Sequence, residues 1–210
     1  MKTVIWDYNG TIVDDIGLCL KIENRMLKER NNPNYPVSLD KYRSLFGFPV
    51  IDYYYKIGYT FETESFAEVS DEFHRYYSEG FDECGLVPGF EEKIHESISR
   101  GYHNVILSAA RQDKLIEQCQ KLGISGYFEE ILGISDLLAN SKVDMAKDWM
   151  RRTSQDPAEC MLIGDTLHDM ETAVALGIEN YTLVPTGHQS FDVLRAASEK
   201  AVGSLFEVVL

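Results

Sequence analysis

Carboxylates, a hydroxyl and a lysine follow four apolar stretches that are rich in β-branched residues. Asp7 follows TVIW (3–6), Ser108 ends NVILS (104–108), Lys142 follows EEILG (129–133), and Asp165 and Asp169 follow CMLIG (160–164). Two or three carboxylates can hold a hard cation such as Mg²⁺. A hydroxyl and a lysine can neutralise the oxygens of a phosphoryl group. Together these residue types favour metal-assisted phosphoryl chemistry, provided that the fold brings them to one place.

Each of these side chains also has a simpler explanation. Asp7 can be an ordinary polar residue after a strand, and Asn9-Gly10 alone is typical of a tight turn. Ser108 can cap a following helix, and Asp165 with Asp169 can be an acidic helix start. Lys142 can be a solvated lysine, with Lys147 as a competitor for any functional role. The positions become informative as a set, because all of them fall at or just after strand ends.

Five short apolar runs predict the strands: the four above and YTLV (181–184). Between most of them, apolar residues recur every three or four positions, which predicts helices over 90–100, 112–122, 143–152 and 169–176. Alternating strands and helices indicate a doubly wound parallel α/β sheet. Ligands in such sheets bind at the carboxyl ends of the strands, where the polar residues fall.

The segment from 13 to 85 breaks this alternation. It carries long amphipathic helical patterns, IGLCLKIENRMLKER and FAEVSDEFHRYYSEG, and no convincing strand. It is too long for a crossover and too apolar for a disordered linker. We therefore expect an α/β core from residues 1–12 and 86–210, with an all-helical cap inserted over 13–85.

Composition narrows the classes of partner. The 210 residues include 34 Asp and Glu against 20 Lys and Arg, a formal charge of -14. Such a field repels nucleic acid and acidic membrane surfaces, although a single cationic pocket for one phosphate is compatible with it. Four scattered cysteines without CxxC spacing predict free thiols rather than a zinc site. With no apolar stretch behind Met1-Lys2, we expect neither a signal peptide nor a membrane span, and a cytoplasmic protein.

Four motifs in order resemble those of the haloacid dehalogenase superfamily. They are DYNGT, the Ser of ILSAAR, the Lys of NSKVD, and GDTLHD with AVALGI. The segment YRSLFGFPVIDYYYKIGY is similar to the cap of phosphoglycolate-phosphatase-like members, and AVGSLFEVV resembles their chain end. The resemblance covers nearly the whole chain and implies a Rossmann-like core with a helical cap.

The resemblance also implies roles for individual residues. Asp7 would attack phosphorus and form an aspartyl-phosphate, which makes the chain a magnesium-dependent phosphatase of small phosphorylated metabolites. Asp7, the backbone carbonyl of Asn9 and Asp165 would hold Mg²⁺, with Asp169 behind them. The phosphoryl group would be bound by Thr11, Ser108, Ala109 and Lys142.

Two positions depart from the family pattern. Phosphatases of the family usually carry Asp two residues after the nucleophile, where it transfers a proton, and Asn9 cannot do so. A missing general acid costs about 10²- to 10⁴-fold in rate, so we expect a slow enzyme that favours leaving groups needing no proton. Ala109 stands where Asn often follows the hydroxyl, which removes a side-chain phosphate donor.

These departures leave two alternatives open. One is a phospho-ligand binding or regulatory protein that has lost catalysis, as Asn9 and Ala109 suggest. The other is a dehalogenase, whose halide leaves unprotonated and needs no metal. The carboxylates of GDTLHD argue against the dehalogenase, because metal-free chemistry does not require them.

Substrate choice is expected to depend on the cap. The resemblance implies phosphoglycolate or a similar metabolite, with Arg43, Phe46, Gly47 and Phe48 as candidate contacts. Arg111, shortly after Ser108, can reach an anionic substrate tail or begin a solvated helix.

Overall fold

The computed structural model describes residues 2–134 and 142–210, and five parallel strands form its central sheet. Their order across the sheet is β5-β4-β1-β6-β7, so the first strand of the chain lies in the middle. Thr3 of β1 pairs with His103 on one side and with Cys160 on the other. The strands are β1 Thr3–Trp6, β4 His103–Arg111, β5 Glu130–Ile134, β6 Cys160–Gly164 and β7 Asn180–Leu183. The predicted doubly wound parallel sheet is confirmed.

Alternate residues of β1 face opposite layers of helices. Val4 and Trp6 belong to one apolar cluster with Phe90 of helix α5 (Phe90–Ser99), while Ile5 belongs to a second cluster with Trp149 of helix α7 (Lys142–Thr153). Side chains of successive strand residues point to opposite faces, which is why a wholly apolar strand suits this central position. The helices of the two layers are α5 Phe90–Ser99, α6 Gln112–Lys121, α7 Lys142–Thr153 and α8 Leu167–Leu176, and α9 Phe191–Ala197 follows β7. The four predicted core helices are thus present, with ends that differ by a few residues.

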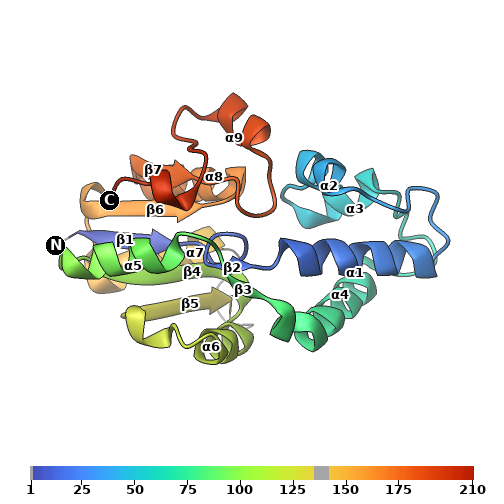
Figure 1. The fold of residues 1–210 in the computed structure, drawn as a ribbon, viewed down its shortest axis with the longest axis horizontal. Helices are drawn as coiled ribbons and strands as arrows, with labels where there is room; N and C mark the ends of the chain where they lie inside the picture. The colour runs from blue at the N-terminus through green and yellow to red at the C-terminus, as the bar shows by residue number, and fades with distance from the viewer. Residues whose placement is uncertain (1, 135–141) are drawn as a thin grey trace.

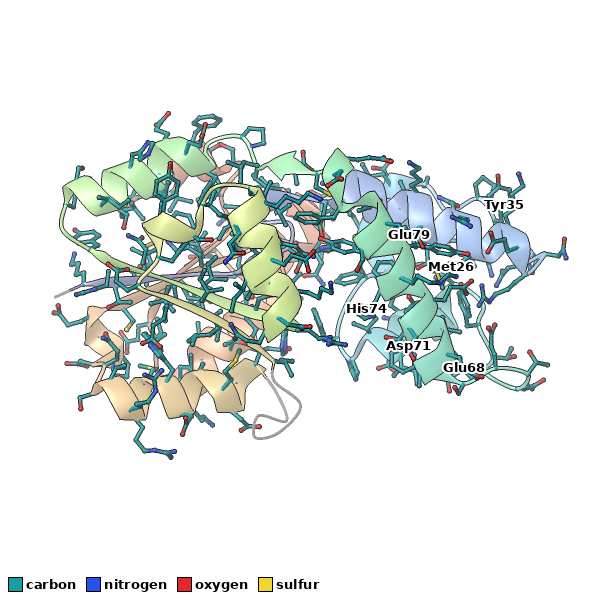
Figure 2. All side chains as sticks on the ribbon, turned by 90° about the horizontal axis from the view of Figure 1, so that it is seen from below. Met26, Tyr35, Glu68, Asp71, His74 and Glu79 are labelled. Atoms are coloured by element: carbon teal, nitrogen blue, oxygen red, sulfur yellow. The ribbon has the colours of Figure 1, made fainter. Side chains whose placement is uncertain are left out.

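Four further helices lie beyond the carboxyl ends of the strands (Figure 1). They are α1 Ile16–Glu29, α2 Leu39–Leu45, α3 Val50–Lys56 and α4 Phe66–Gly80. Helices α1 and α4 contact each other, and Met26 of α1 is fully buried against this part of the core (Figure 2). Ser65 begins α4 with a capping box to Glu68. These helices supply the helical cap expected from the amphipathic patterns.

A two-stranded antiparallel ribbon joins the helical part to the sheet. It pairs β2 Val13–Asp14 with β3 Gly85–Leu86, so the chain leaves and returns at one place. The sequence predicted no strand here, because two-residue strands are too short to show an alternating pattern. The core and cap boundaries at residues 13 and 85 stay a prediction.

Short 3₁₀ turns complete the described chain at Phe81–Glu83, Ser125–Tyr127, Pro157–Glu159 and Leu205–Glu207. Over residues 2–134 and 142–210, none of the helices has the length and apolar character needed to cross a membrane.

Candidate active site

Three adjacent strands and two helix starts place the predicted polar residues around one point. Asp7 follows β1, Ser108 lies in the neighbouring β4, and Asp165 follows β6 on the other side. Lys142 opens α7, and its Nζ lies 2.5 Å from Asp7 Oδ1 and 2.6 Å from Asp169 Oδ1. The switch in strand order beside β1 is the position at which doubly wound sheets bind ligands.

A cluster of three buried carboxylates surrounds this point. Oxygens of Asp7, Asp165 and Asp169 lie within 4.8 Å of one another. Their exposed fractions are 9 %, 1 % and 1 %, and one lysine opposes the three charges. Buried carboxylates of like charge need a cation, and hard divalent ions prefer oxygen ligands. The cluster therefore fits a divalent cation.

The pKa values of the cluster show the same excess of negative charge. Burial and the charge of Asp169 raise the pKa of Asp7 to about 7, although Lys142 acts to lower it. Burial and the charge of Asp7 raise the pKa of Asp165 well above its ordinary value. Burial also acts to raise the pKa of Asp169, but the charge and hydrogen bond of Lys142 outweigh it and lower that pKa. A divalent cation would favour the ionised form of all three groups.

Glycines allow the loops to approach this cluster closely. Gly10 has a φ of +73°, and a Cβ there would lie 2.5 Å from Asp165 Oδ2 and 2.7 Å from the Cα of Gly187. The Gly10 of DYNGT is therefore a turn residue as well as part of the site, since only glycine suits both its backbone and its surroundings.

Asp169 combines the helix-start role that the sequence suggested with a contact to Lys142 that it did not. Its Oδ2 accepts hydrogen bonds from the backbone N (3.0 Å) and Oγ1 (2.7 Å) of Thr166, in a capping box at the start of α8. Its Oδ1 accepts from Lys142. The helix start thereby fixes the carboxylate that orients the lysine.

The predicted phosphate-binding residues divide into two groups. Ser108, Ala109 and Lys142 line the cavity above the cluster, whereas Thr11 is fully buried and is not among its described lining residues. Ser108 Oγ accepts a hydrogen bond from Ala110 N at 3.1 Å, and α6 begins only after Arg111. Ser108 is therefore not the cap of that helix. The register of β4 shifts between Leu107 and Arg111, and Ser108, Ala109 and Ala110 in this irregular part of the strand line the cavity.

The side chain of Asn9 is held by two groups that the sequence analysis missed. Asn9 Nδ2 donates to Asp15 Oδ2 at 2.7 Å and to the Tyr77 hydroxyl at 2.9 Å. The Tyr77 hydroxyl also donates to Asp15 Oδ2, at 2.8 Å, and Gly10 N donates to Asp15 Oδ1 at 3.1 Å. Asp15 is 1 % exposed. Residue 9 thus joins the loop after β1 to α4, and its amide satisfies a buried carboxylate.

His188 is another residue of the site that the sequence analysis missed. Its backbone N donates to Asp165 Oδ2 at 2.6 Å, and its ring Nδ1 lies 2.9 Å from the Tyr42 hydroxyl. Its Nε2 is 3.7 Å from Asp15 Oδ1, and burial lowers its pKa. The signal was available, because GHQS follows the fifth predicted strand just as the other motifs follow theirs.

Of the four cap residues predicted to contact substrate, two line the cavity and two are not among its described lining residues. Phe46 and Phe48 line the cavity, and the ring of Phe48 stacks on His168 at 4.5 Å. Gly47 and Arg43 are not among the described lining residues. Arg43 donates from Nε to the carbonyl of Gly187 at 2.8 Å and from an Nη to that of Thr186 at 3.2 Å. The Arg43 guanidinium therefore ties the helical part to the loop after β7.

The cavity has a volume of about 620 Å³ and extends from the carboxylate cluster into the space among α1, α3 and α4. Arg111 lies on its wall, whereas Lys147 lines a separate hollow on the outer surface. The site thus combines a buried anionic cluster and its lysine with a large chamber, as an enzyme acting on a small molecule requires.

This five-stranded parallel sheet, with its site at the strand ends and a group of helices inserted after the first strand, is a Rossmann-like α/β architecture. Residues 4–182 match the family described as haloacid dehalogenase-like hydrolase, and the chain belongs to that family.

Solved structures with the same fold include a hydrolase of this family from Streptococcus pneumoniae. It is 22 % identical over 99 % of this chain and 96 % of that chain, with a TM-score of 0.82. A protein named as a phosphoglycolate phosphatase, from Lactobacillus delbrueckii subsp. bulgaricus, is 18 % identical, covering 98 % and 96 % of the two chains with a TM-score of 0.79. A protein named as a beta-phosphoglucomutase, from Thermotoga maritima, is 20 % identical, covering 99 % and 96 % with a TM-score of 0.72. Among curated proteins, no match to the sequence was found.

Proposed function

We propose that this hydrolase is a magnesium-dependent phosphatase of small phosphorylated metabolites, with Asp7 as the nucleophile. The observation that carries the proposal is the position of Asp7, a buried carboxylate held 2.5 Å from Lys142 Nζ beside two further carboxylates. Two solved structures of the same fold are named as a phosphoglycolate phosphatase and a beta-phosphoglucomutase, and both names refer to phosphorylated compounds.

Asp7, the backbone carbonyl of Asn9 and Asp165 would hold the cation, and Asp169 would support them. When bound, Mg²⁺ supplies positive charge that offsets the phosphoryl oxygens and the three carboxylates. Lys142 is fixed between Asp7 and Asp169, so it can orient the nucleophile and contact a phosphoryl oxygen without rearrangement. Ser108 and the backbone around Ala109 would contact the remaining oxygens.

The first step would form a bond between an Oδ of Asp7 and phosphorus, and would break the bond from phosphorus to the leaving oxygen. That oxygen takes a proton from solvent, because the amide N–H groups of Asn9 are far too weakly acidic to protonate it and already donate to Asp15 and Tyr77. Water then attacks phosphorus, breaks the acyl-phosphate bond, and releases phosphate and the free carboxylate of Asp7. Leaving groups that are stable without a proton should react fastest.

The two alternative functions, a regulatory phospho-ligand binder and a dehalogenase, predict different results. A regulatory protein that only binds phospho-ligands would show no turnover, and a dehalogenase would release halide without any metal. Because a buried cluster of three carboxylates has no purpose in metal-free halide displacement, the site favours the phosphatase over the dehalogenase.

Steady-state hydrolysis of p-nitrophenyl phosphate tests the proposal. We expect turnover that requires Mg²⁺, is lost with a chelator, and falls at least about 10³-fold in Asp7→Asn. Lys147→Gln, an exposed substitution away from the cavity, is the matched control and should keep full activity. Turnover that survives Asp7→Asn would overturn the proposal.

A further inference from the structure

The cavity is far larger than a phosphoryl group and continues along one side of α1. Asp15 directly precedes α1, and Cys19 and Glu23 follow at four-residue intervals, so the three side chains lie along one side of this helix. All three are buried and line the cavity. This row of side chains leads from the loop that carries Asn9 to the carboxylate of Glu23.

Glu23 is a buried carboxylate with an unused hydrogen-bonding atom. It is 1 % exposed, and its Oε1 has no hydrogen-bond partner among the described residues. Tyr53 also lines the cavity, and its hydroxyl likewise has no hydrogen-bond partner among the described residues. Buried polar atoms are nearly always paired, because leaving one unpaired costs about 1–3 kcal/mol. The other unpartnered atoms among the described residues belong to Tyr8, Thr11, Tyr59 and Ser125, which do not line the cavity, so Glu23 and Tyr53 are the two that a ligand in the cavity can satisfy.

Aromatic rings enclose this end of the cavity. The rings of Tyr42 and Tyr53 are 5.3 Å apart, those of Phe46 and Tyr53 are 5.5 Å apart, and those of Tyr53 and Tyr54 are 5.8 Å apart. All four residues line the cavity. Aromatic faces beside a carboxylate attract cations, and they exclude the water that would otherwise hydrate it.

The lysines and arginines on the described cavity wall already contact acidic residues. Lys142 is held between two carboxylates at the opposite end. The side chains of Arg75, Arg111 and Lys114 are 56 %, 64 % and 45 % exposed and contact acidic residues on their own segments. Near Glu23, Arg30 binds Glu64 and Glu72 and is not among the described lining residues. Burial raises the pKa of Glu23 to about 8, although Arg30 acts to lower it. Below about pH 8 this carboxyl group holds a proton when no ligand is present, and a ligand cation beside it would lower the pKa and bind the ionised carboxylate.

The geometry of α1 sets the distance between the two ends. Asp15 contacts Asn9 directly, and Glu23 lies eight residues further along a helix that runs away from the sheet (Figure 1). At a rise of 1.5 Å per residue this is about 12 Å along the axis. A hydrogen bond from an ammonium to Glu23 covers about 2.8 Å of this distance, so a ligand whose phosphate lies at the Asp7 end must itself extend about 10 Å.

We propose that Glu23, Tyr53 and the rings around them bind a protonated amine, so that the substrate is a phosphate monoester with an elongated leaving group ending in an ammonium. This assignment rests on the proposed phosphatase function and specifies its substrate class. An acidic leaving group such as glycolate would place no cation at Glu23 and is too short to reach it.

Four synthetic esters separate charge from length. Compared with heptyl phosphate, 6-aminohexyl phosphate replaces a terminal methyl by an ammonium at the required distance. Phosphoethanolamine and propyl phosphate differ in the same way, by a terminal ammonium against a methyl group, but their chains are too short to reach Glu23. We expect kcat/KM for the long amine to exceed that for heptyl phosphate by about tenfold or more, and the short pair to differ by less than about threefold.

Glu23→Gln keeps the shape and removes the charge, so the preference for the long amine over heptyl phosphate should vanish in this variant. Glu29→Gln, an exposed position on the same helix, is the matched control and should keep the preference. Equal rates for the two long esters in the unsubstituted protein, or a preference that persists in Glu23→Gln, would overturn the inference. The comparison of the two long esters in the unsubstituted protein is decisive even if Glu23→Gln fails to fold.

Turnover of p-nitrophenyl phosphate distinguishes this inference from the proposed function. If that ester is hydrolysed with Mg²⁺ and the amine preference is absent, only the substrate class is wrong. If no ester is hydrolysed, the phosphatase proposal is wrong, and calorimetric binding of the two long esters then tests the amine site directly. Equal affinities in that titration would overturn the inference as well.

Discussion

The side-chain amide of Asn9 donates a 2.7 Å hydrogen bond to the buried carboxylate of Asp15. Asn9 therefore has a structural role at the position where related phosphatases carry a proton-transferring Asp. The residue that replaces the general acid thus also pairs with the carboxylate of Asp15, so a substitution at residue 9 must affect both proton transfer and this hydrogen bond.

Asn9→Asp should destabilise the protein, because it replaces the donor by a second carboxylate beside Asp15. One of the two must then hold a proton, which raises its pKa above the unfolded value of about 4. A raised carboxyl pKa means that stability falls as pH rises from the unfolded to the folded pKa. Urea unfolding should show a loss of about 1–3 kcal/mol at pH 8 and a smaller loss at pH 5.

The exchange of Asn9→Asp together with Asp15→Asn is the matched control. It keeps one amide and one carboxylate in contact, so the stability should return at both pH values. A single Asn9→Asp variant as stable as the parent protein at pH 8 would contradict this account.

The same exchange tests the cost of the missing general acid. With a carboxyl group at residue 9, hydrolysis of alkyl phosphates should rise by about 10²-fold or more, whereas p-nitrophenyl phosphate, whose leaving group needs no proton, should gain little. Steady-state rates over a series of leaving-group pKa values measure this difference. Parallel plots for the two proteins would show that residue 9 does not determine proton transfer.

Magnesium should stabilise the protein more at high pH than at low pH. Burial raises the pKa of Asp7 to about 7, so without a cation stability is lost as pH rises from about 4 to 7. A bound cation favours the ionised carboxylates and removes this loss. Thermal unfolding with and without Mg²⁺ should give a larger shift at pH 8 than at pH 5, and an equal or reversed shift would contradict a metal site at Asp7 and Asp165.

Lys142→Met should cost about 3 kcal/mol or more, since it leaves Asp7 and Asp169 without their buried counter-charge. Phosphatase activity should fall with it. Lys147→Met, on the exposed face of the same helix, controls for the loss of a lysine from α7. Chemical denaturation of both variants is the measurement, and equal losses would mean that the buried ion pairs contribute nothing.

Tyr77→Phe removes the hydroxyl that joins α4 to Asp15 and Asn9. We expect it to lower stability by about 1.5–3 kcal/mol, because the bond reaches a buried carboxylate. Tyr76→Phe is the neighbouring control, with longer bonds of 3.2 and 3.3 Å to Glu72 and Glu29, and should cost less. Equal stabilities for the two variants would contradict a special role for Tyr77.

Strand positions and the main site residues were predictable because they depend on local pattern. The apolar runs fix β1 and β6, and the parallel topology then brings Asp7, Ser108 and Asp165 together without knowledge of any side-chain contact. Lys142 was identifiable by the same strand-end rule, although its neighbours Asn140 and Ser141 lie outside the described residues.

Other features depend on tertiary contacts that no pattern encodes. Asp15 precedes a helix and looks like an ordinary N-cap, yet its carboxylate makes no capping bond and turns to Asn9 and Tyr77 instead. Arg43 looks like a substrate ligand, but backbone carbonyls of the loop after β7 accept its hydrogen bonds. From the sequence, Glu23 is one charge on an amphipathic helix, and only the folded structure shows that it is buried on the cavity wall.

Detection of phosphate on Asp7 is the most direct test of the account. The protein is mixed with acetyl phosphate and Mg²⁺, quenched in acid within the first turnovers, and examined by intact mass and peptide mapping. We predict one added phosphoryl group, located in the peptide that contains Asp7 and absent from Asp7→Asn. Rapid turnover with no phosphoprotein at any time, or a phosphoryl group on a different residue, would contradict the assignment of Asp7 as the nucleophile.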